Sequence, residues 1–73
     1  MGLRRNLAVN MRRIRMERGI SQEEFADLVD LHRTYITQIE GEKRSPTIDV
    51  VERIAKRLDL TVVDLLCDPP RRS

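Results

Sequence analysis

The stretch SQEEFADLVDLHRTYITQIEG, residues 21–41, decides the fold because it contains two short helical patterns joined by a turn. The first opens with a capping box, in which the Ser21 hydroxyl accepts from a free backbone amide and Glu24 reaches back to the cap. The second begins near His32, which can serve as its N-cap. Asp30 stands in the turn between them, and Asp tolerates the left-handed backbone region better than most residues. Apolar residues recur at helical spacing in both patterns: Phe25, Ala26, Val29, Ile36 and Ile39.

The other side of the second helix carries only small or polar residues. They fall on a single stripe: Arg33, Thr34, Thr37, Gln38 and Gly41. Arginine suits the O6 and N7 atoms of guanine, glutamine suits adenine, and threonine can hydrogen-bond or contact a thymine methyl. The stripe predicts a helix–turn–helix whose second helix, about residues 32–41, enters the major groove of DNA. A merely solvated helix face is the alternative, since most polar helix faces only contact water.

The chain length predicts one domain, residues 1–73, near the lower limit for a self-sufficient core. The single Cys67 cannot form an intramolecular disulfide, and one Cys with one His cannot build a structural zinc site. We therefore expect no metal and no cofactor, and we expect oligomerisation to supply stability. No apolar run approaches the roughly 20 residues that span a bilayer. This predicts a cytoplasmic protein with no membrane partner.

An enzyme is not expected. The sequence has no glycine-rich phosphate loop, and its one His and one Cys lie far apart. Glu23 and Glu24 are adjacent on a helix, so they point about 100° apart, which is poor geometry for paired acid–base chemistry. A domain of this size also has little space for a ligand-sized cavity, so no small-molecule ligand is expected.

The formal net charge of +2 hides an uneven distribution. Residues 1–20 contain six arginines against Glu17 alone, whereas residues 21–31 contain four carboxylates and no Lys or Arg. This asymmetry fits a small domain with a basic side turned toward phosphate, although it also fits a well-solvated protein. Arg12 and Arg13, on the outward face of the first helix, either contact phosphate or are solvated.

Three further helices are expected around the central pair. The first covers residues 3–18, and Gly19 can end it in the left-handed conformation. The next runs from an N-cap at Thr47 to about residue 58, and the last follows a capping box of Thr61 and Asp64. The residues expected to face inward are Leu3, Leu7, Met11, Ile14, Ile48, Val51, Ile54, Ala55 and Leu58, with Cys67 packing at the end of the last helix. The prediction is a compact all-α domain of five helices, with a core at about residues 3–67 and a loose tail at 68–73.

The chain resembles the lambda-repressor-like helix–turn–helix family, also called the XRE or Cro-type family. The matching stretches cover about residues 5–67: MRRIRMERGISQEEFADLV, LHRTYITQIEGEKRSP and VVERIAKRLDLTVVDLL. Within the family it is most similar to short single-domain regulators, such as restriction–modification controller proteins. The sequence departs from the family at Glu42, where a glycine often stands. Either Glu42 takes the left-handed conformation or the helix ends one residue earlier. Asp59 likewise replaces a frequent glycine.

The resemblance implies roles for individual residues. Base edges would be contacted by Arg33, Thr34, Thr37 and Gln38, with Tyr35 bordering them. Phosphate would be contacted by Gln22, which can also brace a base-reading side chain, and by Lys43 and Arg44 in the following loop. Arg15 and Glu40 would form a partly buried structural ion pair.

A separate set of apolar residues falls partly outside the inward stripes of the last two helices. Together they could form a self-complementary patch: Val50, Leu60, Val62, Val63 and Leu66. This predicts a twofold homodimer that presents two reading helices to half-sites about 34 Å apart on a near-palindromic operator.

Two functions remain open from the sequence. The first is a DNA-binding transcriptional regulator that recognises its operator as a homodimer. The second is a protein-interaction adaptor or an antitoxin-like partner with only secondary DNA binding. In that case the acidic segment 21–31 and the last two helices would be the contact surface.

Overall fold

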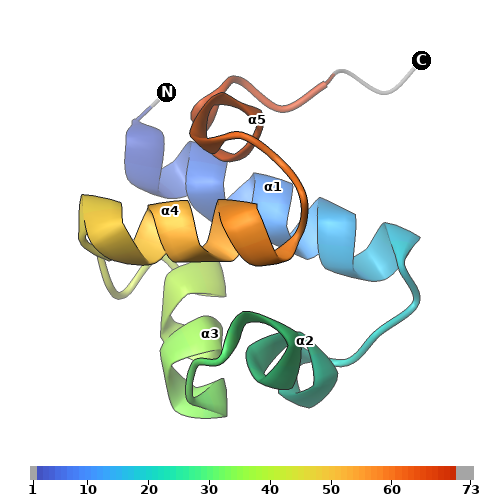
Figure 1. Cartoon of the computed structure of the whole chain (residues 1–73). Helices are drawn as coiled ribbons and strands as arrows, with labels where there is room; N and C mark the ends of the chain where they lie inside the picture. Colours follow the sequence, from blue (N-terminus) through green and yellow to red (C-terminus); the bar gives the residue numbers. More distant parts are fainter. Residues whose placement is uncertain (1, 71–73) are drawn as a thin grey trace.

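The computed structural model describes residues 2–70 and contains five α-helices and no strand within that range (Figure 1). The expected all-α architecture is therefore confirmed. Expected and observed helix ends differ by at most a residue or two. The helices are α1 (Leu3–Glu17), α2 (Gln22–Val29), α3 (Arg33–Glu40), α4 (Ile48–Arg57) and α5 (Val62–Leu66).

Side-chain caps begin four of the five helices, α2 to α5, as the sequence predicts for each of them. Both capping boxes form: Ser21 Oγ accepts from the Glu24 amide at 3.0 Å, and the Thr61 amide donates to Asp64 Oδ2 at 2.9 Å. The hydrogen bond from the Thr61 amide lowers the pKa of the Asp64 carboxyl, because it favours the charged form. His32 Nδ1 accepts from the Thr34 amide, so His32 is the N-cap of α3.

Left-handed residues end the helices where the chain must turn. Gly19 has φ of 67°, and Asp30, Glu42 and Asp59 have φ of 59°, 60° and 60°. Of the two possibilities at the end of α3, Glu42 therefore takes the left-handed conformation. Non-glycine residues rarely adopt this region, and Asp is among those that tolerate it best.

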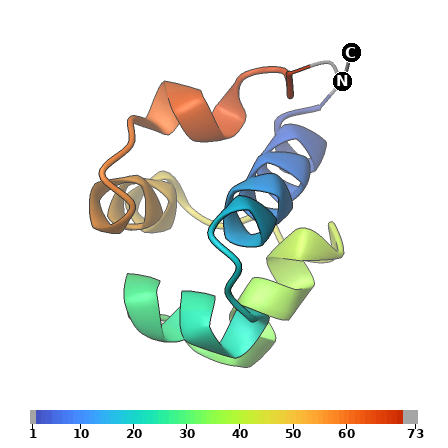
Figure 2. The ribbon, with the colours of Figure 1, turned by 90° about the vertical axis from the view of Figure 1, so that its right-hand side faces the viewer.

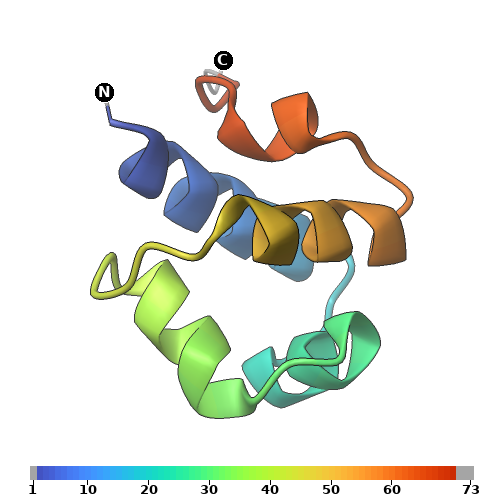
Figure 3. The same ribbon diagram turned by 60° about the vertical axis from the view of Figure 1, so that its left-hand side comes forward.

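The helix pair α2–α3 packs at one side of α4, while α5 lies at the other (Figures 1 and 3). α1 contacts both α3 and α5, and its start lies beside the end of α5 (Figure 2). Side chains from every helix meet in one apolar core: Leu7, Met11, Ile14, Phe25, Ala26, Val29, Ile36, Ile39, Val51, Ile54, Ala55, Leu58 and Leu65. No helix in residues 2–70 is long and apolar enough to cross a membrane.

Three residues predicted to be buried are exposed. Leu3 is 63 % exposed and Ile48 is 75 % exposed. Each is the first residue of its helix, so it extends past the neighbours that cover the following turns. Cys67 is also exposed: its backbone is extended at the end of α5, its carbonyl accepts from Asn10, and its thiol lies at the surface near the Asp64 carbonyl.

Two buried asparagines of α1 hold the end of α5. Asn10 Nδ2 donates to the carbonyls of Leu65 and Cys67, at 2.8 Å each. Asn6 Nδ2 donates to the Leu66 carbonyl and to Asp68 Oδ1, at 3.1 Å each. The last carbonyls of a helix have no partner within it, so these amides satisfy groups that would otherwise be buried without hydrogen bonds. The predicted tail thus begins with a residue held by α1, and its last part, 71–73, lies outside the described residues.

Asn10→Ala should lower the free energy of unfolding by about 2 kcal/mol, because two carbonyls lose their donor in a buried setting. Urea denaturation followed by circular dichroism measures the change. Arg12→Ala, on the exposed face of the same helix, is the control and should change stability by less than about 0.5 kcal/mol. Equal effects of the two substitutions would contradict the capping role of Asn10.

Candidate nucleic-acid interface

The face of α3 opposite the core is open to solvent. Ile36 and Ile39 point into the core and are fully buried. Four of the predicted base-contacting residues lie on the other side of the helix: Arg33, Thr34 and Thr37 are exposed, and Gln38 is half-buried. The fifth, Tyr35, is half-buried and packs partly against the core, so it borders this face.

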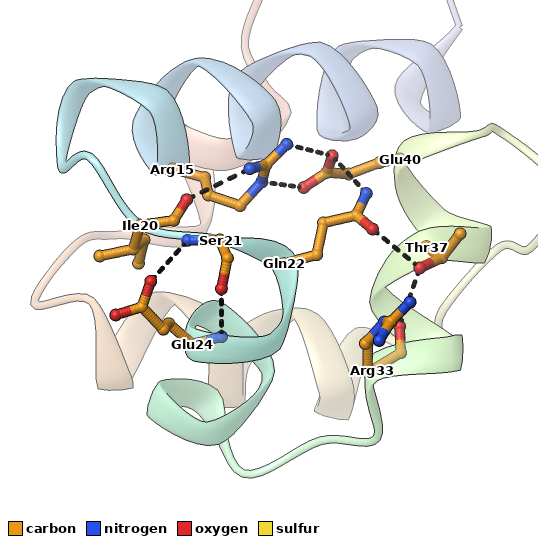
Figure 4. A network of polar contacts seen from close by, with 8 residues as sticks. All are labelled: Arg15, Ile20, Ser21, Gln22, Glu24, Arg33, Thr37 and Glu40. Atoms are coloured by element: carbon orange, nitrogen blue, oxygen red, sulfur yellow. Dashed lines mark hydrogen bonds and ion pairs between the residues drawn. The ribbon is translucent and has the colours of Figure 1, made fainter.

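A chain of polar contacts connects this face to the interior (Figure 4). Arg15 of α1 binds Glu40 of α3 through two hydrogen bonds, Nε to Oε2 at 2.9 Å and Nη2 to Oε1 at 3.1 Å. The two side chains are only 16 % and 6 % exposed. The hydrogen bond to Glu40 raises the pKa of Arg15. The predicted partly buried ion pair is therefore present, and it joins α1 to α3.

Gln22 extends the chain from the ion pair to the exposed face. Its Nε2 donates to Glu40 Oε1 at 3.1 Å, and its Oε1 lies 3.0 Å from the Thr37 hydroxyl. A carboxylate only accepts, so the amide nitrogen must face Glu40 and the oxygen must face Thr37. The sequence proposed phosphate contact for Gln22, and in the structure its amide also braces a residue of the candidate reading face.

Thr37 and Arg33 lie side by side at the end of this chain (Figure 4). The Thr37 hydroxyl lies 3.1 Å from the Arg33 carbonyl as well as near Gln22, and its one proton serves one acceptor at a time. The Arg33 guanidinium lies 3.7 Å from the Glu23 carboxylate, and both side chains are more than half exposed. An exposed pair of this kind is worth about 0–1 kcal/mol, so Arg33 can leave Glu23 at little cost.

The loop after α3 lies against the same face. Lys43 and Arg44 are both exposed, and Arg44 contacts Tyr35 and Gln38 of α3. The first turns of α1 reach this loop: Arg4 donates to Ser45 Oγ at 3.2 Å, and Arg5 lies 3.5 Å from Glu42. The Arg5 contact partly neutralises the carboxylate that stands beside the predicted phosphate ligands.

From the sequence, Arg12 and Arg13 were expected either to contact phosphate or to be solvated, and no role was assigned to Arg4 or Arg5. Arg13 pairs with Glu17 one turn along α1, at 3.3 Å. Nothing in the sequence distinguishes Arg4 and Arg5 from the other arginines of α1. Their proximity to the loop follows only from how α1 crosses α3.

The five predicted dimer residues lie on α4, on α5 and on the link between these helices. Val50, Leu60, Val62 and Leu66 are half-buried against the core, and Val63 is 71 % exposed. α5, which carries three of them, packs on the side of α4 away from the α2–α3 pair (Figure 1).

Comparison with known proteins supports the resemblance. A family model described as "Helix-turn-helix" matches residues 11–65. The control protein C.SmaI of Serratia marcescens is 38 % identical over 66 residues, covering 90 % of this chain and 79 % of its own. The control protein C.BamHI of Bacillus amyloliquefaciens is 44 % identical over 57 residues, covering 77 % and 70 %. The crystal structure of a hypothetical transcription factor from Neisseria superposes with a TM-score of 0.85 at 37 % identity, covering 92 % of this chain and 77 % of that one.

Glu40→Ala should lower the free energy of unfolding by about 3 kcal/mol, because it leaves the Arg15 cation partly buried without its counter-ion. Replacing both partners, Arg15→Met with Glu40→Met, should recover more than half of this loss, since neither charge then needs solvation. Urea denaturation of the three proteins makes the comparison. A double variant less stable than Glu40→Ala would contradict the account.

Proposed function

This chain belongs to the helix-turn-helix family of DNA-binding transcription regulators, and from that membership we propose that it recognises a near-palindromic operator as a homodimer. In this proposal α3 enters the major groove and reads base edges. The observation that carries it is the exposed face of α3, which a partly buried chain of polar contacts holds in place from behind.

The residue types on this face suit direct readout. Arg33 carries a planar guanidinium that can bind guanine O6 and N7 together. Its only ion pair among residues 2–70 is the exposed one with Glu23, so DNA can compete for it. Thr34 offers a hydroxyl and a methyl group at the first turn of α3. Thr37 presents its methyl group beside a hydroxyl held by Gln22, which favours an apolar contact with a thymine methyl.

Affinity without sequence preference comes from groups that meet phosphate. Lys43 is exposed in the loop after α3, and Gln22 is the first residue of α2, where a helix N-terminus favours phosphate. Arg4 and Arg5 lie next to the same loop and add positive charge. Each phosphate contact releases condensed counterions, so binding should weaken steeply as salt concentration rises.

Dimerisation is proposed through α4 and α5. Val63 is the most exposed apolar side chain of the predicted patch, and half-buried Leu60, Val62 and Leu66 lie near it in the chain. A twofold contact there would leave both α3 helices free, because α5 and the α2–α3 pair lie at different sides of α4 (Figure 1). A small domain also gains stability when such a patch is covered.

Arg33→Ala and Lys43→Ala should separate readout from phosphate binding. Arg33→Ala should erase preference at one base pair, at a cost of about 1–3 kcal/mol on the preferred sequence. Lys43→Ala should weaken all sequences alike and reduce the slope of log affinity against log salt by about 1. Operators selected from a random duplex pool, followed by binding titrations at several salt concentrations, provide both readouts. If Arg33→Ala left operator preference intact, the assignment of the α3 face would be wrong.

Val63→Glu should convert a dimer to a monomer, because it places a charge in the centre of the proposed contact. Light scattering gives the molar mass, and operator affinity should fall at least about tenfold as the second half-site contact is lost. Leu28→Glu, on an exposed apolar residue of α2, is the matched control and should leave the molar mass unchanged. A Val63→Glu protein that remains dimeric would refute this interface.

A further inference from the structure

Two side chains of α3 and one from the loop that follows it form a cluster: Tyr35, Gln38 and Arg44. Tyr35 and Gln38 are three residues apart on α3, so they are neighbours on its surface. Arg44 lies in the loop between α3 and α4, and its side chain contacts both Tyr35 and Gln38. Its Cζ is 4.9 Å from the centre of the Tyr35 ring, and its Nε donates to Gln38 Oε1 at 2.7 Å.

The contact fixes which way the Gln38 amide faces. The Nε atom of an arginine only donates, so the atom that meets it must be the amide oxygen. The amide nitrogen therefore faces away from Arg44. None of the hydrogen bonds within residues 2–70 uses Gln38 Nε2, which leaves both of its protons available. Stacking on Tyr35 restrains the guanidinium, so the whole cluster restrains the amide.

We propose that Arg44 is a positioning residue that makes Gln38 a hydrogen-bond donor in the major groove, so that Gln38 favours guanine over adenine. This inference rests on the proposed function, since it concerns how the same helix face selects its sequence. It changes the usual expectation for glutamine, which binds adenine by accepting from N6 and donating to N7 at once.

The preference follows from the groups that each base presents. Adenine needs the Gln38 oxygen as an acceptor for its N6 protons, but Arg44 already donates to that oxygen. The second lone pair of the Gln38 oxygen lies beside the Arg44 guanidinium cation, which repels the positively polarised hydrogen of an adenine N6 group. Guanine presents two acceptors, N7 and O6, and no donor at these positions. Both acceptors are attracted by the Gln38 amide protons and by the nearby cation.

The test compares sequences selected from a random duplex pool by four proteins: wild type, Gln38→Ala, Arg44→Met and Lys43→Met. Gln38→Ala identifies the base pair that Gln38 reads, as the one whose preference disappears. Arg44→Met keeps a long apolar side chain over Tyr35 but removes the donor and the charge. Lys43→Met removes the neighbouring charge and has no hydrogen bond to the Gln38 side chain, so it controls for the loss of charge.

Wild type should prefer guanine at the Gln38 pair, and Arg44→Met should shift the guanine-to-adenine ratio at that pair toward adenine by about tenfold. Both Met variants should bind more weakly overall, and Lys43→Met should keep the wild-type ratio.

An unchanged ratio in Arg44→Met would overturn the inference, as would a loss of preference at a base pair other than the one that Gln38→Ala identifies. In both cases wild type still selects sequences, so the proposed function stands. A wild-type protein that selects no sequence would overturn the proposed function together with this inference.

Discussion

The carboxylate of Glu40 is the point on which the arrangement of the helices depends. It accepts hydrogen bonds from Arg15 of α1 and from Gln22 of α2 while itself belonging to α3. Desolvating two charges costs several kcal/mol per ion, so such a pair adds little net stability. Its hydrogen bonds instead restrict how α3 can rotate and slide against its neighbours. That restriction extends to the surface, because the Gln22 amide oxygen accepts a hydrogen bond from the Thr37 hydroxyl on the exposed face.

In a chain this short, hydrogen bonds at the helix ends contribute much of the frame. Most helices begin with a side-chain cap, and several end in a left-handed residue. Asn6 and Asn10 of α1 complete the hydrogen bonds at the end of α5. The result separates two tasks: α1, α4 and α5 supply the support, and α2 with α3 presents polar side chains outward (Figure 1).

The positions of the helices were predictable from local sequence patterns. Capping boxes at Ser21 and Thr61 and apolar spacing locate the helices, because both signals act within a few residues. Spacing alone misplaced Leu3 and Ile48, since burial at the first residue of a helix depends on what lies beyond its end. The contact between Arg44 and Gln38 depends on the conformation of the loop between them. The roles of Asn6 and Asn10 could not be predicted either, because their partners are set by packing between helices. The bracing contact of Gln22 with Thr37 was foreseen only through the family resemblance.

The central claim is that the exposed face of α3, and not α4 or α5, contacts DNA. Nuclear Overhauser effects between the protein and a selected duplex would measure this. The methyl groups of Thr34 and Thr37 should give cross-peaks to major-groove base protons, including cytosine H5 and thymine methyl protons, while Val63 should give none to DNA. Cross-peaks from α4 or α5 to DNA, with the methyl groups of α3 unaffected by the duplex, would contradict this claim.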